Sequence, residues 1–230
     1  MAKIMRVKFE KTGDMIYISH LDVQRLLQRA FRRAEIELSF SQGFNPHPKM
    51  SYGNALALGV ESYGEYVDIE IEDDISPEQL LDRINKTLPD GMRFLKCIEL
   101  DGSEKSLAPN IMYGDYEFII PNSNLEYSVV EKRIESLKSM EEITTTKLNK
   151  KKKIVEVNIR PMIKTIELKS VDNFIVVESI LATGSKQNLN TNVFLPKLVE
   201  ILGLNIDPLD IDIIRKDLYF EDGDKLVKPF

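Results

Sequence analysis

Two hydrophobic periodicities alternate along the first part of the chain. Apolar and polar side chains alternate over residues 3–11, which is typical of a β-strand. From Ser19 to about residue 35 the apolar residues instead recur at helical spacing and fall on one face: Val23, Leu26, Leu27, Ala30, Phe31 and Ala34. Ser19 and Asp22 form a Ser-x-x-Asp capping box, so this helix is expected to begin directly after Ser19.

The pattern continues with expected strands at 55–58 and 66–72. A second helix is expected to begin at Ser76-Pro77, because serine suits the cap and proline the first helical position. A strand at 92–99 follows the turn at Pro89-Asp90-Gly91. The resulting order, β-α-β-β-α-β, is that of a ferredoxin-like unit, which we assign to residues 1–100.

The same order begins again after a polar, turn-rich segment at 101–110, which we interpret as a linker. The second half predicts two helices and six strands, at 112–121, 122–137, 143–148, 154–159, 163–168, 174–181, 192–202 and 211–220. Pro196 is expected in the first turn of the helix at 192–202. We therefore predict an α+β protein of two tandem ferredoxin-like units, the second over residues 111–230 with an extra β-hairpin.

Composition narrows the class of protein. The chain has 230 residues, of which 43% are hydrophobic and 30% charged, as in ordinary globular proteins. It has no apolar stretch of membrane-spanning or signal-peptide length, and its one cysteine excludes an internal disulfide and a cysteine-based zinc site. These observations predict a cytoplasmic protein without membrane attachment or cofactor.

Charge is distributed unevenly. The net charge is −6, yet residues 1–50 hold nine Lys and Arg against five Asp and Glu. Four of these cations lie on one face of the first helix, opposite its apolar stripe: Arg25, Arg29, Arg32 and Arg33. Guanidinium groups suit phosphate oxygens, and Asp22 is the one counter-charge on this arc, so we predict that this face contacts RNA phosphates. A partner protein's acidic surface and an ordinary solvated helix face are the alternatives.

The loop at 41–49 carries a second set of candidate RNA contacts. Phe44 offers a stacking face, and the other four candidates offer hydrogen bonds or charge: Gln42, Asn45, His47 and Lys49. Gly43, Pro46 and Pro48 are expected to fix the shape of the loop. The alternative is a proline-stiffened crossover with Phe44 in the core.

The chain has two histidines, His20 and His47, and both lie in these segments. His20 is expected on the apolar side of the helix as a core or cap residue. Together with Asp22 they could form a two-His-one-carboxylate metal set, but nothing in the spacing brings the three together and we predict no metal site. His47 is the one candidate for a catalytic residue, as a general base. Glu61, Glu65 and Asp68 cluster after the loop, and Glu65 and Asp68 are expected at the surface. Lys150–Lys153 are expected at a solvated hairpin tip, with a second RNA contact as the alternative.

Five motifs together resemble a known family. They are Phe9-x-Lys11-x-Gly13, Ile18-Ser19-His20-Leu21-Asp22, Arg25 with Arg29-Ala30-x-Arg32-Arg33-Ala34, Ser41-x-Gly43-Phe44-Asn45-Pro46-His47-Pro48-Lys49, and Gly59-x-Glu61-Ser62. They resemble the radical-SAM-associated family, a domain of unknown function found fused to, or encoded beside, cobalamin-binding radical SAM proteins. Its genes often lie near those of an E/G-type ribonuclease and ribosomal proteins. The resemblance implies a standalone member whose partner is a separate cobalamin-binding radical SAM protein.

These observations favour an RNA-binding accessory protein over an enzyme. It would present rRNA or tRNA to the radical SAM enzyme that modifies it. Two alternatives remain open: a metal-independent endoribonuclease of the tandem-ferredoxin type that uses His47, and a protein–protein adaptor without RNA contact.

Overall fold

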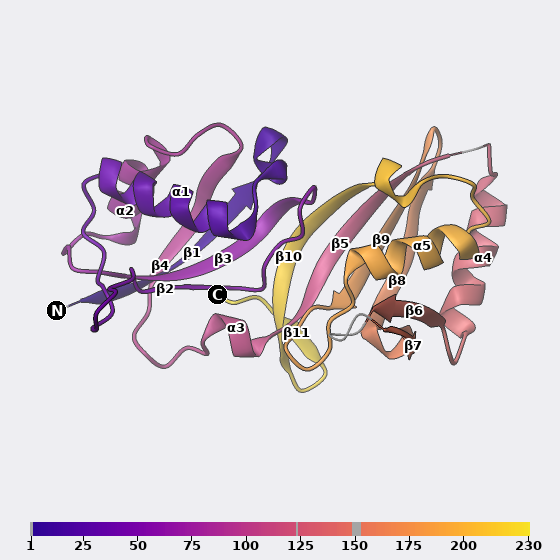
Figure 1. Cartoon of the computed structure of the whole chain (residues 1–230). Coiled ribbons are helices and arrows are strands. Elements are labelled where there is room, and N and C mark those ends of the chain that lie inside the picture. Colours follow the sequence, from indigo (N-terminus) through magenta and orange to yellow (C-terminus); the bar gives the residue numbers. More distant parts are fainter. Residues whose placement is uncertain (1, 123, 149–152) are drawn as a thin grey trace. The chain divides into compact units, whose positions relative to one another are not determined.

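The computed structural model describes residues 2–122, 124–148 and 153–230 and has a mixed α+β fold (Figure 1). The chain divides into two compact units. Unit one comprises Met1–Ile111 and Arg215–Phe230, and unit two comprises Met112–Ile214. Unit one is therefore built from two stretches of chain that are far apart in the sequence, and the second predicted domain, 111–230, contributes its last sixteen residues to it.

Unit one contains β1 (Lys3–Lys11), a 3-10 turn η1 (Gly13–Tyr17), α1 (His20–Arg33), β2 (Met50–Tyr52), β3 (Glu61–Ile71), α2 (Pro77–Asn85), β4 (Met92–Glu99), α3 (Leu107–Asn110), most of β10 (Asp212–Asp222) and β11 (Lys225–Val227). β1 pairs antiparallel with both β3 and β4, and β3 lies between β1 and β10. β2 adds to β3 over three residues, and β11 adds to β10.

The core of unit one has two parts, one on each side of its strands. The buried face of α1 and the apolar residues of α2 pack on alternate residues of β1, β3 and β4, including Met5, Val7, Phe9, Val67, Ile69 and Phe94. A smaller cluster contains Tyr66, Leu107, Ile111, Leu218 and Phe220, with Phe230 packed against it. Because Tyr66 and Val67 are neighbours in β3, the two clusters lie on opposite faces.

The predicted starts of both helices of unit one are confirmed. The Asp22 backbone N–H donates to Ser19 Oγ at 3.2 Å, which caps α1. Ser76 and Gln79 form a complete capping box at α2, whose first residue is Pro77. The strand predicted at 55–58 is wrong. Gly59 N–H donates instead to Ile16 O at 3.0 Å, so this apolar stretch runs against η1, and β3 pairs with β2.

Unit two contains β5 (Ile111–Pro121), α4 (Tyr127–Ser139), β6 (Thr144–Leu148), β7 (Ile154–Asn158), η2 (Arg160–Met162), β8 (Ile163–Val171), β9 (Phe174–Ala182), α5 (Thr191–Ile201) and η3 (Pro208–Asp210). β9 pairs antiparallel with β5 and with β8, and β6 and β7 form a separate hairpin, which confirms the predicted extra hairpin. Pro196 lies in the second turn of α5, so its predicted place in the first turn is wrong.

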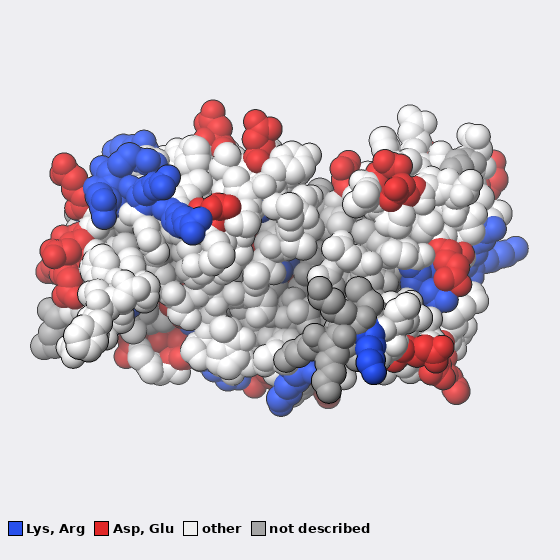
Figure 2. All heavy atoms as spheres, viewed as in Figure 1, with Lys and Arg blue, Asp and Glu red and all other residues white. Residues whose placement is uncertain are grey.

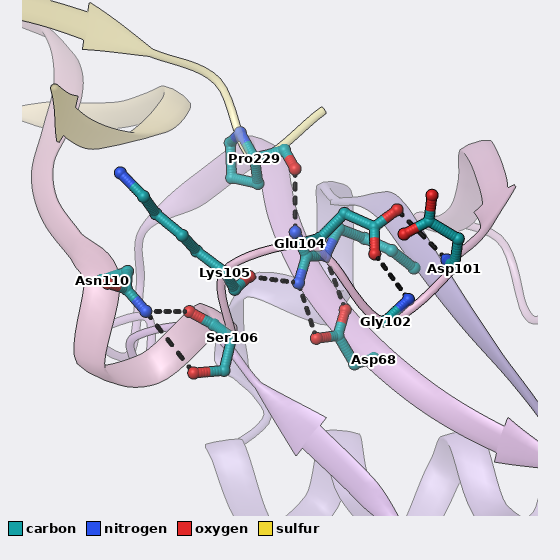
Figure 3. A network of polar contacts seen from close by, with 9 residues as sticks. Asp68, Asp101, Gly102, Glu104, Lys105, Ser106, Asn110 and Pro229 are labelled. Carbon is teal, nitrogen blue, oxygen red and sulfur yellow. Dashed lines mark hydrogen bonds and ion pairs between the residues drawn. The ribbon is translucent and has the colours of Figure 1, made fainter.

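One buried arginine links several segments of unit one (Figure 3). Arg6 of β1 is 1% exposed, and its guanidinium binds both carboxylate oxygens of Asp68 at 2.7 and 2.8 Å. It also donates to Pro229 O at 2.9 Å and to Lys105 O at 2.7 Å. This one side chain therefore joins β1, β3, the segment before α3 and the C-terminal residues. The segment at 101–110, which we expected to be a linker, contains α3, whose Leu107 is buried.

Asp217 of β10 is a second buried charge in unit one. Its carboxylate accepts from Lys8 Nζ and Lys228 Nζ at 2.8 Å each and from Tyr66 Oη at 2.6 Å. Burial alone would raise the pKa of Asp217, but the hydrogen bonds from Lys228, Lys8 and Tyr66 outweigh burial and lower the pKa below its ordinary value of 3.8.

Asp217→Asn is expected to destabilise the protein at neutral pH by about 1–3 kcal/mol, because Lys8 and Tyr66 lose their charged acceptor. A lowered carboxyl pKa stabilises the folded state above the unfolded pKa, and this contribution is lost as pH falls through the folded pKa. The variant should therefore lose less stability than the wild type between neutral pH and the acid range below 3.8. Urea unfolding at a series of pH values measures this difference. Parallel pH profiles for the two proteins would contradict the assignment.

Candidate functional site

The outer face of α1 gathers cations on the surface of unit one. Figure 2 shows a cluster of Lys and Arg side chains over the position of α1 in Figure 1. All four arginines are exposed, as the helical spacing predicts: Arg25, Arg29, Arg32 and Arg33. A groove of about 410 Å³ is lined by Arg25, Arg29 and Arg33, with Leu26 and Pro89 as apolar wall.

Two of these four arginines use their side chains within the protein, and the other two can bind a ligand. Arg33 donates to Thr87 O at 2.6 Å, and Arg25 pairs with Asp22 at 3.2 Å on the exposed surface. Among the residues that the structure describes, none forms a hydrogen bond or ion pair with the side chain of Arg29 or Arg32. The pKa of Asp22 is lowered, chiefly by the hydrogen bond from Ser19, so Asp22 is ionised at neutral pH and offsets one of the four positive charges.

The loop between α1 and β2 is a closed hairpin with an exposed tip. An isolated bridge joins Phe40 and Pro48, Ser41 N–H donates to His47 O at 2.8 Å, and His47 N–H donates to Ser41 Oγ at 3.0 Å. Gly43 has φ +136°, a conformation that suits glycine. At the tip of this loop, residues 42–47, five side chains are exposed: Gln42, Phe44, Asn45, Pro46 and His47.

Phe44 is fully exposed, so the alternative that places it in the core is wrong. Lys49, in contrast, is not an open cation, because its Nζ pairs with Glu70 at 2.7 Å. His47 and Lys49 line a groove of about 640 Å³ together with Pro48, Met50 and residues of β1. No described residue hydrogen-bonds the imidazole of His47, so nothing in the described chain orients it as a general base.

The three residues of the metal set take separate roles. Asp22 binds Ser19 and Arg25, and His47 lies in the hairpin loop. His20 contacts Gln24 at 2.9 Å, and its ring lies edge-on to Tyr52 with a centroid distance of 5.2 Å. Over residues 2–122, 124–148 and 153–230, no group of three His, Cys, Asp or Glu side chains is placed to hold a metal ion.

A buried polar cluster beside His20 was not predicted from the sequence. Glu65 is 6% exposed, so its expected surface position is wrong: Arg215 binds its two carboxylate oxygens at 2.8 and 2.5 Å. Ser62 Oγ donates to the same carboxylate at 2.5 Å, and Lys11 and Tyr52 lie around the same small cavity. Asp68 is half-buried in its pairing with Arg6, which also differs from the surface position expected of it.

The burial of this cluster is visible in the structure and not in the local sequence. Residues 64–67 of β3 are all buried, which breaks the alternation of a strand with one exposed face. The partner of Glu65 lies 150 residues away in β10, and no spacing rule connects the two. Of the predicted lysine cluster, Lys150, Lys151 and Lys152 lie outside the described residues, and Lys153 is exposed.

Comparisons with known proteins give a family and a distant structural resemblance. None of the helices in the described part of the chain combines the length and apolar character needed to cross a membrane. No curated protein matches the sequence. A crystal structure described as that of an unknown protein from Galdieria sulphuraria is similar over 95% of this chain and 98% of the other, with 10% identity and a TM-score of 0.26. Residues 5–191 match a family described as an uncharacterized protein conserved in bacteria, and the chain therefore belongs to this family, DUF2344.

Proposed function

We propose that this protein is an RNA-binding accessory protein that works with a separate radical SAM enzyme in the modification of rRNA or tRNA. The observation that carries the proposal is the row of exposed arginines on α1, two of which have no partner among the described residues. Arg25, Arg29 and Arg33 are like charges four residues apart on one helix and repel one another, whereas an anionic ligand would bind the row.

The spacing of the arginines suits a nucleic-acid strand. Arg25, Arg29 and Arg33 follow one another at four-residue steps, and each step advances about 6 Å along a helix. This advance is comparable to the separation of successive phosphates along one strand. Arginine also binds phosphate through paired N–H groups, which a lysine row would not do.

Phe44 supports a single strand as the ligand. A fully exposed phenylalanine is costly in water, and bases of an unpaired strand stack on such rings. The neighbouring Gln42 and Asn45 are exposed and offer amide donors and acceptors for base edges.

The radical SAM partner is inferred from the motifs in residues 9–62, which resemble the radical-SAM-associated family. The chain itself has one cysteine, Cys97, and burial raises the pKa of its thiol to about 12. Such a thiol is unreactive, so the cluster chemistry would belong to the partner. Purification of the tagged protein from its own cells, with and without nuclease, tests whether the partner binds directly or through RNA.

We also retain the finer interpretation of the fold, two ferredoxin-like units. Unit one has the order β1-α1-β2-β3-α2-β4, with β1 between β4 and β3 and β2 on the far side of β3. Unit two repeats it as β5-α4-β8-β9-α5 before β10, with the hairpin β6-β7 inserted and β9 between β5 and β8.

RNA binding should depend steeply on salt. Four phosphate contacts on a single strand give a slope of log K against log[salt] of about −2.8, and Arg29→Ala/Arg32→Ala should reduce it to about −1.4. The measurement is fluorescence anisotropy with a labelled single-stranded RNA at several salt concentrations. Lys105→Ala/Lys225→Ala, which removes two exposed cations elsewhere on unit one, should leave the slope unchanged. Absence of RNA binding at low salt would refute the proposal and favour the adaptor.

His47→Ala distinguishes an accessory protein from an endoribonuclease. We expect RNA binding to weaken by a few-fold to tens-fold, the scale of one lost hydrogen bond or stacking contact of about 1–2 kcal/mol, and we expect the wild type to leave RNA intact. If His47 were a general base, the same change would leave binding nearly intact and reduce cleavage by about 10²–10⁴-fold. A gel of labelled RNA, with and without chelator, measures both. Chelator-resistant cleavage lost in the variant would establish the endoribonuclease instead.

A further inference from the structure

The small cavity beside His20 lies in unit one and is separate from the arginine row. Its volume is about 20 Å³, enough for a group the size of one water molecule. Six polar side chains line it: Lys11, His20, Tyr52, Asn54, Glu65 and Tyr66. Apolar residues of β1, α1 and the segment after β2 complete its wall. None of the four arginines of α1 lines this cavity.

Lys11 is the unusual group in the cavity wall. The residue is 3% exposed, and its ammonium donates one hydrogen bond, to Ile16 O at 3.1 Å. An ammonium has three N–H groups, so two remain without an acceptor among the described residues, and none of those residues forms an ion pair with it. A buried charge without an opposite charge strongly destabilises a protein, unless a ligand supplies that charge.

Glu65 does not neutralise Lys11, because its carboxylate is already bound. Arg215 occupies both oxygens, and Ser62 donates to one of them. Lys11, Arg215 and Glu65 together therefore carry one excess positive charge. Burial, with Arg215 beside it, lowers the pKa of Lys11, while Glu65 acts in the opposite direction.

Tyr52 is a second hydrogen-bond donor in the wall of the same cavity. Tyr52 Oη contacts Met50 Sδ at 3.8 Å, and a thioether is a weak acceptor. Burial raises the pKa of Tyr52, so the phenol keeps its proton. His20, which begins α1, is half-buried at the rim, and burial lowers its pKa so that it is neutral near pH 7. The start of α1 adds a positive potential, which the exposed Asp22 partly offsets.

We propose that this cavity binds one oxygen atom of a carboxylate or phosphate group, held by Lys11 Nζ and Tyr52 Oη. The excess positive charge selects an anion, the unfilled donors select an oxygen, and the volume admits a single atom of that size. The rest of the ligand lies at the rim beside His20 and Leu56, both half-exposed. A terminal phosphate of RNA and a free small anion share this chemistry.

The test follows the Lys11 side chain directly in the full-length protein. Lysine is labelled with ¹³C at Cε, and the Lys11 signal is assigned by its absence in Lys11→Met. Sodium formate and sodium phosphate are titrated separately, with sodium chloride at equal ionic strength as the matched control. We expect a saturable shift of the Lys11 signal and a rise in Tm with at least one oxyanion. Tyr52→Phe should weaken binding by about 2–10-fold, and Lys225→Met, at an exposed position of β11, should change neither readout.

Lys11→Met should lose the oxyanion-dependent rise in Tm while keeping or raising the Tm without anion, because an unpaired buried charge is removed. If Lys11→Met does not fold, the weakened binding of Tyr52→Phe still tests the site. RNA oligonucleotides with a 5′-phosphate and with a 5′-hydroxyl identify the source: a Lys11 shift with the phosphorylated oligonucleotide alone assigns the oxyanion to an RNA end. No saturable shift with any probe, or an equal rise in Tm in Lys11→Met, would overturn the site. RNA binding through Arg29 and Arg32 is measured separately, so either proposal can fail alone.

Discussion

Arg215→Met should lower the free energy of unfolding by about 3–5 kcal/mol, one of the largest effects of any single substitution in this chain. The change leaves Glu65 buried and charged, with Ser62 as its remaining hydrogen-bond donor among the described side chains. The loss of stability comes mainly from burying the Glu65 carboxylate without a cation, and less from losing the attraction within the ion pair. Urea unfolding followed by circular dichroism measures it.

A second variant separates these two contributions. Glu65→Gln/Arg215→Met removes both charges, and it should recover most of the lost stability because a neutral amide is far cheaper to bury than a carboxylate. Lys225→Met, at an exposed position of β11, is the control and should stay within about 0.5 kcal/mol of the wild type. A loss below about 1 kcal/mol in Arg215→Met would show that Glu65 reaches water or another cation.

A fragment of residues 1–100 should fail to melt cooperatively. Its two helices and four strands are complete, and the sequence pattern alone predicts that it folds by itself. In the structure, however, Arg6, Glu65 and Tyr66 each take partners from residues 215–230. Without these residues one face of β3 exposes Tyr66 and loses the cover of Leu218 and Phe220.

The matched control joins residues 1–111 to 215–230 through a flexible Gly-Ser linker, which restores unit one without unit two. This joined fragment should show a single cooperative transition in calorimetry and circular dichroism. A cooperative transition of the 1–100 fragment at the same temperature would mean that the C-terminal segment is dispensable for unit one.

The elements of unit one were predictable where local chemistry determines them. The alternation of β1, the apolar stripe of α1 and the Ser76-Pro77 start of α2 each depend on neighbouring residues alone. The strand expected at 55–58 is wrong because its apolar side chains suit a strand and an irregular segment packed on η1 equally well. The hydrogen bond from Gly59 N–H to Ile16 O favours the irregular segment, and these two residues are far apart in the sequence.

The candidate site likewise contains residues whose position the local sequence predicts and residues whose position it does not. Helical periodicity was enough to place the arginines of α1 on the surface. The loop at 41–49, in contrast, left open whether Phe44 is exposed or lies in the core. The cluster around Lys11 and Glu65 was missed because a charged residue is ordinarily a surface residue. Its burial depends on Arg215, which a single sequence gives no means of pairing with Glu65.

The discontinuity of unit one affects its folding during synthesis. The ribosome releases the N-terminal stretch about a hundred residues before Arg215 is made, which at 5–20 residues per second is a delay of about 5–20 s. Throughout this interval Glu65 and Arg6 lack partners that their native positions require, while unit two emerges as one continuous stretch. We therefore expect the later-made unit to fold first, and the nascent N-terminal half to depend on chaperones until its last strand arrives.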